Sequence, residues 1–177
     1  MNIKALIPLG LFLLLCAIFG FGLTRDPGAL PTEMLDKPFP DFEITTLYDE
    51  TSYVTENVLK GEISLVNIFG SWCASCVTEH PKLIEIGQQG NVQIIGVDWR
   101  DSREKGARWL KAYGDPYKVV LFDDSSQLAI DLGVGGAPES FLVGPDGIIR
   151  YKHVGVITDE VWDNIFTPII RRIQSEI

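Results

Sequence analysis

Residues 70–81, GSWCASCVTEHP, place two cysteines three positions apart behind Trp72. The run before them, ISLVNIF at 63–69, is apolar enough for a strand that is buried on both faces. The residues after them, 74–88, repeat apolar side chains at the spacing of a helix. The cysteine pair therefore lies where a buried strand turns into a helix. Four kinds of site share this cysteine spacing: a redox catalyst, a structural disulfide, half of a metal site and a haem attachment site.

Three of these alternatives find little support in the rest of the chain. A structural disulfide stabilises most when it closes a long loop, whereas this pair encloses a dipeptide. Zinc would need two further ligands, and the other cysteine and histidine residues of the chain are Cys16, His80 and His153. Haem attachment requires a histidine directly after the second cysteine, where Val77 stands. Redox catalysis is therefore the favoured interpretation, and we expect no metal and no other cofactor.

Predicted strands and helices alternate along the chain around this pair. The expected elements are a hairpin of 42–47 and 52–55, strands at 63–69, 91–99 and 117–122, helices at 74–88, 102–113 and 125–132, a loop at 133–138, a hairpin that turns at 144–147, and a final helix at 158–175, capped by Thr158 and kinked at Pro168. This alternation predicts an α/β layer with parallel strands. In that setting, a CxxC between a strand and a helix is typical of thioredoxin-like redox sites.

The expected helix start gives the two cysteines different chemistry. Unpaired N–H groups and the positive end of the helix dipole lie at the N-terminus of a helix. We expect Cys73 at that position, where its thiolate, the nucleophilic form, is stabilised. Cys76 lies one turn later and is placed to attack a mixed disulfide formed by Cys73.

The first 25 residues differ from the rest of the chain. Residues 5–23 carry no charge and would span roughly 28 Å as a helix, close to the ~30 Å of hydrocarbon in a bilayer. This run is longer than the core of a cleaved signal peptide, and its one small-x-small candidate, Gly20-Phe21-Gly22, makes a poor cleavage site. We therefore expect residues 1–25 to be a retained single-pass anchor, with a cleaved signal as the alternative. The remaining chain would then lie outside the cytoplasm.

The remainder of the chain is acidic. The formal charge is 15 − 24 = −9, and residues 1–25 contribute +2, so residues 26–177 carry −11. This charge disfavours nucleic acid and anionic lipid as partners. Residues 26–41 are rich in proline and acid and predict a linker, which leaves 42–177 for the domain.

Four stretches of the chain resemble one family closely. They are NIFGSWCASCVTEHP (67–81), GVDWRD (96–101), WLKAYGDPYKVVLFDD (109–124) and GVGGAPESFLVGPDGIIRYKHVG (133–155). Together they are similar to the DsbE/CcmG family, the membrane-tethered thioredoxin-like proteins of cytochrome c maturation. The resemblance extends over most of residues 36–172. It implies a thioredoxin-like fold with an N-terminal β-hairpin and a central insertion, preceded by one transmembrane helix.

The same resemblance implies a function in the periplasm. Family members reduce the disulfide of apocytochrome c haem-binding motifs, directly or through a partner dithiol protein, and a membrane electron donor of the DsbD/CcdA type reduces them again. Two alternatives stay open: a general periplasmic disulfide reductase or oxidant, and a tethered module that docks apocytochrome without catalysis.

The resemblance also assigns roles around the dithiol. Cys73 corresponds to the attacking thiolate and Cys76 to the resolving thiol. The dipeptide between them, Ala74-Ser75, departs from the proline-containing dipeptides that are commoner in the family, so the reduction potential stays open. Trp72 is expected to shield the sulfurs, and packing at the rim of the site is the alternative.

A carboxyl group is expected near the dithiol for proton transfer. Asn67 stands where ordinary thioredoxins carry a buried aspartate that manages the proton of the resolving cysteine. The resemblance places an acid near the dithiol at Glu79 and at Glu139, and either could take over that task. Asp98 is a weaker candidate, since an acid at a strand end commonly faces water.

The last group of expected site residues surrounds Pro138. This residue matches a proline that follows a cis peptide bond in the family and faces the active site. We expect the loop before it, with Gly136 and Ala137, to expose backbone groups. An extended substrate segment could pair with them and present its cysteine to Cys73.

Overall fold

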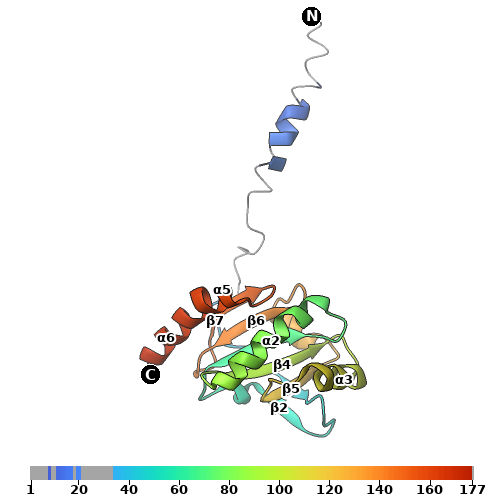
Figure 1. Ribbon diagram of the computed structural model, residues 1–177, viewed down its shortest axis with the longest axis vertical. Helices are drawn as coiled ribbons and strands as arrows, with labels where there is room; N and C mark the ends of the chain where they lie inside the picture. The colour runs from blue at the N-terminus through green and yellow to red at the C-terminus, as the bar shows by residue number, and fades with distance from the viewer. Residues whose placement is uncertain (1–7, 9–10, 18, 21–33, 177) are drawn as a thin grey trace, which may run out of the picture. The chain divides into compact units, whose positions relative to one another are not determined.

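The centre of the protein is a five-stranded sheet in the order β5–β4–β3–β6–β7 (Figure 1). The computed structural model describes residues 8, 11–17, 19–20 and 34–176. The parallel strands are β3 (Ser64–Phe69), β4 (Gln93–Trp99) and β5 (Val119–Asp123). Strand β6 (Glu139–Val143) is antiparallel to β3, and β7 (Ile149–Val154) is antiparallel to β6. Every residue of β3 and β4 is buried, as their apolar sequences predict.

Helices cover both faces of this sheet (Figure 1). One face packs against α2 (Ala74–Gln89), α3 (Arg103–Tyr113) and the C-terminal α6 (Thr167–Ser175), which contribute Leu83, Trp109 and Ile170 to one core cluster. The opposite face packs against α4 (Gln127–Asp131) and the short helix η2 (Glu56–Leu59). Burying a large apolar side chain in such a core contributes about 1.5–3 kcal/mol. These two layers bury β3 completely, and β3 leads directly into the CxxC.

The predicted order of elements is confirmed, with small shifts at the ends. The N-terminal hairpin consists of β1 (Glu43–Thr45) and β2 (Tyr53–Thr55), which pair antiparallel. Elements α3, β5 and α4 separate the β3–α2–β4 half from the β6–β7–α6 half, where a central insertion is expected. Helix η2 has no counterpart in the prediction.

The expected final helix is divided into three parts. These are α5 (Asp159–Val161), the π-helical turn η3 (Trp162–Phe166) and α6. The cap is as predicted, because Thr158 Oγ1 accepts a hydrogen bond from the Val161 N–H at 3.2 Å. Pro168 lacks the N–H that would reach the carbonyl of Asn164, so α-helical hydrogen bonding cannot run through this turn. The interruption expected at Pro168 therefore takes the form of a π-helical turn just before it.

The domain begins earlier than the sequence predicts. Phe39, assigned to the linker 26–41, is 4% exposed and belongs to the core cluster on the α4 face. Its N–H donates to the carbonyl of Gly147 at 2.8 Å. Residues 34–176 form one compact unit, so the predicted boundary at residue 42 falls too late.

The expected anchor, 1–25, lies largely outside the described residues. Residues 11–17 are helical. Within the part of the chain that the structure describes, no helix is both long and apolar enough to cross a membrane.

Candidate active site

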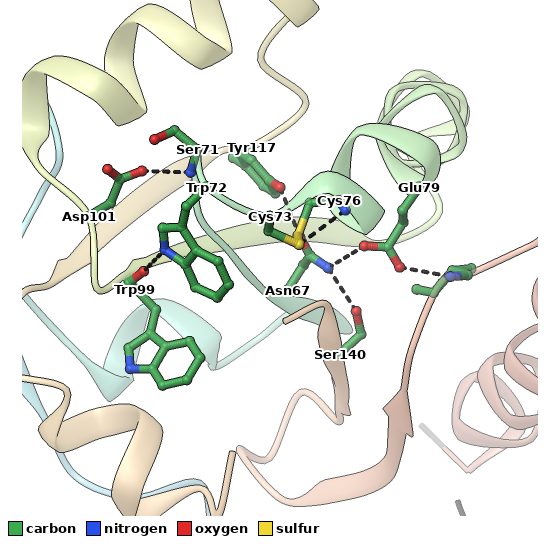
Figure 2. The surroundings of a disulfide bond; sticks show 11 residues. Asn67, Ser71, Trp72, Cys73, Cys76, Glu79, Trp99, Asp101, Tyr117 and Ser140 are labelled. Atoms are coloured by element: carbon green, nitrogen blue, oxygen red, sulfur yellow. Dashed lines mark hydrogen bonds between the residues drawn. A yellow bond between two sulfur atoms is a disulfide. The ribbon is translucent and has the colours of Figure 1, made fainter. Parts of the chain in front are cut away.

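The two cysteines lie at the first turn of α2, as predicted. A disulfide joins Cys73 and Cys76 in this structure, with their Cα atoms 5.3 Å apart (Figure 2). Cys73 is the residue that caps α2, and its Sγ accepts a hydrogen bond from the Cys76 N–H at 3.1 Å. A Cys73 thiolate would be stabilised by that same N–H and by the positive end of the 16-residue helix. The two side chains are 4% and 2% exposed, so only a substrate that docks closely can reach them.

The turn before the cysteines is held to the neighbouring strand β4. The indole Nε1 of Trp72 donates to the carbonyl of Trp99 at 3.0 Å, and the two rings meet edge to face at 5.8 Å. A side chain at Gly70 would overlap the Trp72 ring, so glycine is required there. Trp72 is half exposed and packs against the rim of the site, and its shielding of the sulfurs stays a prediction.

A second contact, which the sequence does not predict, holds this turn. The Ser71 N–H donates to Asp101 Oδ2 at 2.6 Å (Figure 2). Since β3 and β4 are adjacent and parallel, the loops after them meet at one edge of the sheet. Asp101 belongs to the stretch GVDWRD (96–101), which resembles the family, but the sequence does not show which backbone group Asp101 binds.

Asn67 is the centre of a buried hydrogen-bond network beneath the dithiol. Its Nδ2 donates to Glu79 Oε2 and to Ser140 Oγ, both at 2.9 Å. Its Oδ1 accepts from the Tyr117 hydroxyl at 2.9 Å, which fixes the orientation of the amide. Gly96 pairs with Asn67 across the sheet, and a side chain there would overlap the Tyr117 ring. Tyr117 and Ser140 are positioning residues that the sequence analysis missed.

Glu79 is the buried acid of this site. It is 1% exposed, and its second oxygen, Oε1, accepts from the Ile157 N–H at 2.8 Å. Burial raises the pKa of Glu79 to about 7, although the hydrogen bonds from Ile157 and Asn67 favour the ionised form. It follows Cys76 by one turn on the buried face of α2, and Figure 2 shows it beside Asn67 and the disulfide. Glu79 can therefore take up or release a proton near neutral pH.

Glu139 lies on the opposite face of the sheet from Glu79. Side chains alternate along β6, and Ser140 points toward Asn67, so Glu139 points away from that network. Its Oε1 accepts from the N–H groups of Gly135 and Gly136 at 2.8 and 3.0 Å. Its Oε2 lies 2.9 Å from Lys152 Nζ in a buried ion pair. Glu139 therefore lies outside the Asn67 network and holds the loop, and a role for it in proton transfer beside the dithiol stays a prediction.

The loop that ends at Pro138 has the expected backbone form. The Ala137–Pro138 peptide bond is cis. The Gly136 N–H is already bound by Glu139, so it is not free for a substrate. Among the described residues, none forms a hydrogen bond with the backbone groups of Ala137. Of the two predicted substrate-binding residues, Ala137 is therefore the better placed.

Asp98, the weaker candidate for proton transfer, is buried and does not face water. It is 0% exposed and lies on the same face of β4 as the helices α2 and α3. Burial and the nearby Asp101 carboxyl raise the pKa of Asp98 to about 8. It makes no hydrogen bond with Asn67 or Glu79, so the Glu79 network does not include it.

Comparison with known proteins agrees with this architecture. Residues 34–165 match the Redoxin family. The chain is 45% identical over 172 residues to the thiol:disulfide interchange protein DsbE of Allochromatium vinosum. The alignment covers 97% of this chain and 95% of that protein. It is 40% identical over 171 residues to the DsbE of Pseudomonas aeruginosa, and this alignment covers 97% of this chain and 94% of that protein. A solved structure, a secreted thiol-disulfide isomerase from Corynebacterium glutamicum, has the same fold, with a TM-score of 0.65 at 20% identity over 75% of this chain and 85% of that chain.

The CxxC at the start of α2, the Redoxin match and the near full-length similarity to DsbE proteins agree with one another. The chain therefore belongs to the DsbE/CcmG family of thioredoxin-like proteins and is a thiol–disulfide oxidoreductase.

Proposed function

We propose that this oxidoreductase is a reductant of cytochrome c assembly. In this proposal it reduces the disulfide of apocytochrome c haem-binding motifs in the periplasm, directly or through a partner dithiol protein. The observation that carries the proposal is the pairing of Cys73 and Cys76 at the start of α2 with a buried acid, Glu79, whose pKa lies near neutral. Near full-length similarity to DsbE proteins supports the assignment to this system.

The chemistry begins at Cys73. Its thiolate attacks one sulfur of the substrate disulfide, and the other substrate sulfur leaves as a thiolate that takes a proton from solvent. Cys76 then loses its proton to Glu79 and attacks the Cys73 sulfur. The remaining substrate sulfur leaves as a thiolate, so two electrons have passed to the substrate and a Cys73–Cys76 disulfide has formed. Asn67 orients Glu79 throughout by donating to Oε2.

The substrate is held by the loop before Pro138. An extended segment pairs with the backbone groups of Ala137 as an added strand, which brings its cysteine toward Cys73. Glu139 keeps the loop in place through the N–H groups of Gly135 and Gly136. Specificity for one cysteine sequence would come from side chains next to this pairing.

The chain is tethered by its first 25 residues in this proposal. The charge-free run 5–23 is long enough to span the bacterial inner membrane once, with the catalytic domain on the periplasmic side. A tether raises the effective concentration of the domain near a membrane-embedded donor of the DsbD/CcdA type, which returns electrons to the Cys73–Cys76 disulfide.

Complementation of a deletion strain tests the proposal. Cells without the protein should lose c-type cytochromes, and the parent chain but not a Cys73→Ala/Cys76→Ala double variant should restore them. An added thiol reductant should bypass the defect. If the double variant restores assembly, the chain is a docking module. If cytochromes are unaffected while other periplasmic proteins accumulate disulfides, the chain is a general reductase.

A further inference from the structure

One buried carboxyl has no part in the proton transfer described above. Asp98 is 0% exposed, and neither of its oxygens has a hydrogen-bond partner among the residues that the structure describes. In the sheet it pairs with Phe69 of β3 and Phe122 of β5. An ionised carboxylate without a partner is costly in such a place, so the protonated form is favoured.

The Asp98 charge contributes to the raised pKa values of two tyrosines, Tyr48 and Tyr117, whose hydroxyl groups are engaged elsewhere. Tyr48, in the loop after β1, donates to Asp115 at 2.8 Å. Tyr117, before β5, donates to Asn67 at 2.9 Å. Neither proton is available to Asp98.

Helix α3 packs directly against the Asp98 carboxyl and offers it no cation. A side chain at Gly106 would overlap Asp98 Oδ2, so the helix backbone itself closes this side. Arg103, one turn earlier on α3, donates to the carbonyl of Leu47 and pairs with Glu50. No ion pair of the described region includes Asp98.

The remaining neighbour is Asp101, just beyond the end of β4. Burial first, and then the charge of the nearby Asp101 carboxylate, raise the pKa of Asp98 to about 8. Asp101 already accepts two backbone hydrogen bonds, from the Ser102 N–H at 2.8 Å and from the Ser71 N–H at 2.6 Å. Both Asp101 oxygens thus act as acceptors, so a hydrogen bond between the two carboxyls requires the proton to be on Asp98.

We propose that Asp98 is a positioning residue of the active site: its protonated carboxyl donates to Asp101, and Asp101 in turn holds the Ser71 N–H. Ser71 begins the turn that carries Trp72 and Cys73, and Figure 2 shows Asp101 reaching that turn from the loop after β4. When Asp98 loses its proton, two negative charges face each other across the former hydrogen bond. Asp101 is then displaced, and the turn loses its hold on β4.

This coupling predicts a loss of order in the turn at alkaline pH that is independent of the thiols. The disulfide form of the full-length protein, in detergent micelles, is the form to measure, because neither Cys73 nor Cys76 titrates in it. NMR then follows the Ser71 amide and the Asp98 side-chain carbon between pH 6 and pH 9.5. Both resonances should move with a common midpoint near 8, and the exchange protection of the Ser71 amide should fall on the order of tenfold across the step.

Asp98→Asn is the decisive variant. Its amide can donate to Asp101 at every pH but cannot titrate, so the Ser71 resonance should stay at the acidic end of the parent curve. Glu79→Gln separates the Glu79 step, which lies near pH 7, and should leave the Ser71 step intact. A flat Ser71 resonance in the parent, or the same step in Asp98→Asn, would overturn the proposal.

If Asp98→Asn does not fold, the titration of the parent protein alone tests the coupling between Asp98 and Ser71. An Asp98 carbon that titrates near its ordinary pKa, or that titrates near 8 without any change at Ser71, contradicts the coupling. Because these readouts need no substrate and no thiol exchange, their failure would leave the proposed role in cytochrome c assembly untouched. Failure of that role would equally leave the coupling between Asp98 and Ser71 in place.

Discussion

At the scale of single residues, the two cysteines are expected to divide the reaction between them. Cys76→Ala should accumulate a mixed disulfide between Cys73 and its target, because attack survives while the resolving step is lost. Cys73→Ala should accumulate none. Non-reducing gels of cells expressing each variant, with mass spectrometry of the adducts, measure this. Equal trapping by the two variants, or none by Cys76→Ala, would show that the roles are assigned wrongly.

Glu79 should control how fast the second step proceeds. With its pKa near 7, Glu79 is mostly protonated below pH 7 and accepts a proton only above it, so the rate of disulfide exchange should rise through that pH. Glu79→Gln should remove this rise and slow exchange at pH 7.5 by about a hundredfold. Stopped-flow kinetics of Trp fluorescence across pH would show both effects.

The control for this variant lies on the same helix. Glu85 is a solvated acid of α2, with a side chain 54% exposed, and the exchange rate of Glu85→Gln should match that of the parent.

The stability of the protein should also depend on the proton of Glu79. The folded chain keeps the proton of Glu79 up to about pH 7, whereas the unfolded chain releases it near 4.5, so the free energy of unfolding falls between these values. The free energy of unfolding of Glu79→Gln should lack that fall. If the pH–rate profile of Glu79→Gln equals that of the parent, Glu79 has only a structural role.

At the scale of elements, the loop 133–138 depends on the ion pair behind it. Glu139 and Lys152 have side chains that are 3% and 9% exposed, so Glu139→Gln leaves a buried charge without its partner. We expect a loss of about 3 kcal/mol in the free energy of unfolding and a weaker affinity for substrate, with the pH–rate profile of Glu79 unchanged.

An exposed ion pair supplies the comparison. Lys118 and Glu62 have side chains 52% and 60% exposed, and Glu62→Gln should change the free energy of unfolding by no more than about 0.5 kcal/mol. Urea unfolding of both variants, with KM and kcat determined separately, makes the measurement. If Glu139→Gln shifts the pH–rate profile instead of KM, Glu139 takes part in proton transfer after all.

The elements themselves were largely predictable, because each depends on a local pattern. The apolar run of β3, the helical period of α2 and the turn between β6 and β7 are all visible in the sequence. The π-helical turn η3 was not, since it reflects how the chain accommodates Pro168 while α6 stays packed on the sheet. The burial of Phe39 in the core was also not predictable, because a single aromatic residue in a proline-rich segment gives no periodic pattern of apolar residues.

The site was predictable only where residues lie close in sequence. Glu79 is three positions after Cys76, and helix geometry places it correctly. Glu139 was also expected to serve the dithiol, but the alternation of β6 turns it away from the Asn67 network, and only the pairing register of the sheet reveals that. Tyr117 and Asn67 lie 50 positions apart, and Asp101 and Ser71 lie 30 positions apart. No local sequence pattern predicts contacts over such separations.

At the scale of the whole molecule, the tether should matter for electron supply. Replacing residues 1–25 with a cleavable signal should give a soluble domain that is more oxidised in cells, because its encounters with a membrane-embedded donor become bimolecular. Fractionation, N-terminal sequencing and thiol alkylation measure this. A parent protein that already starts near Leu23 and is recovered in the soluble fraction would contradict the anchor without affecting the chemistry of Cys73.

The thiol state of the protein in growing cells decides whether the chain acts as a reductant. Rapid acid quenching followed by alkylation with a mass-adding maleimide separates the dithiol from the disulfide form of Cys73 and Cys76. We predict that most of the protein carries the dithiol when the electron donor is present and the disulfide when the donor is deleted. A protein that is mostly disulfide in both strains would contradict the proposed role as a reductant and would make the chain an oxidant.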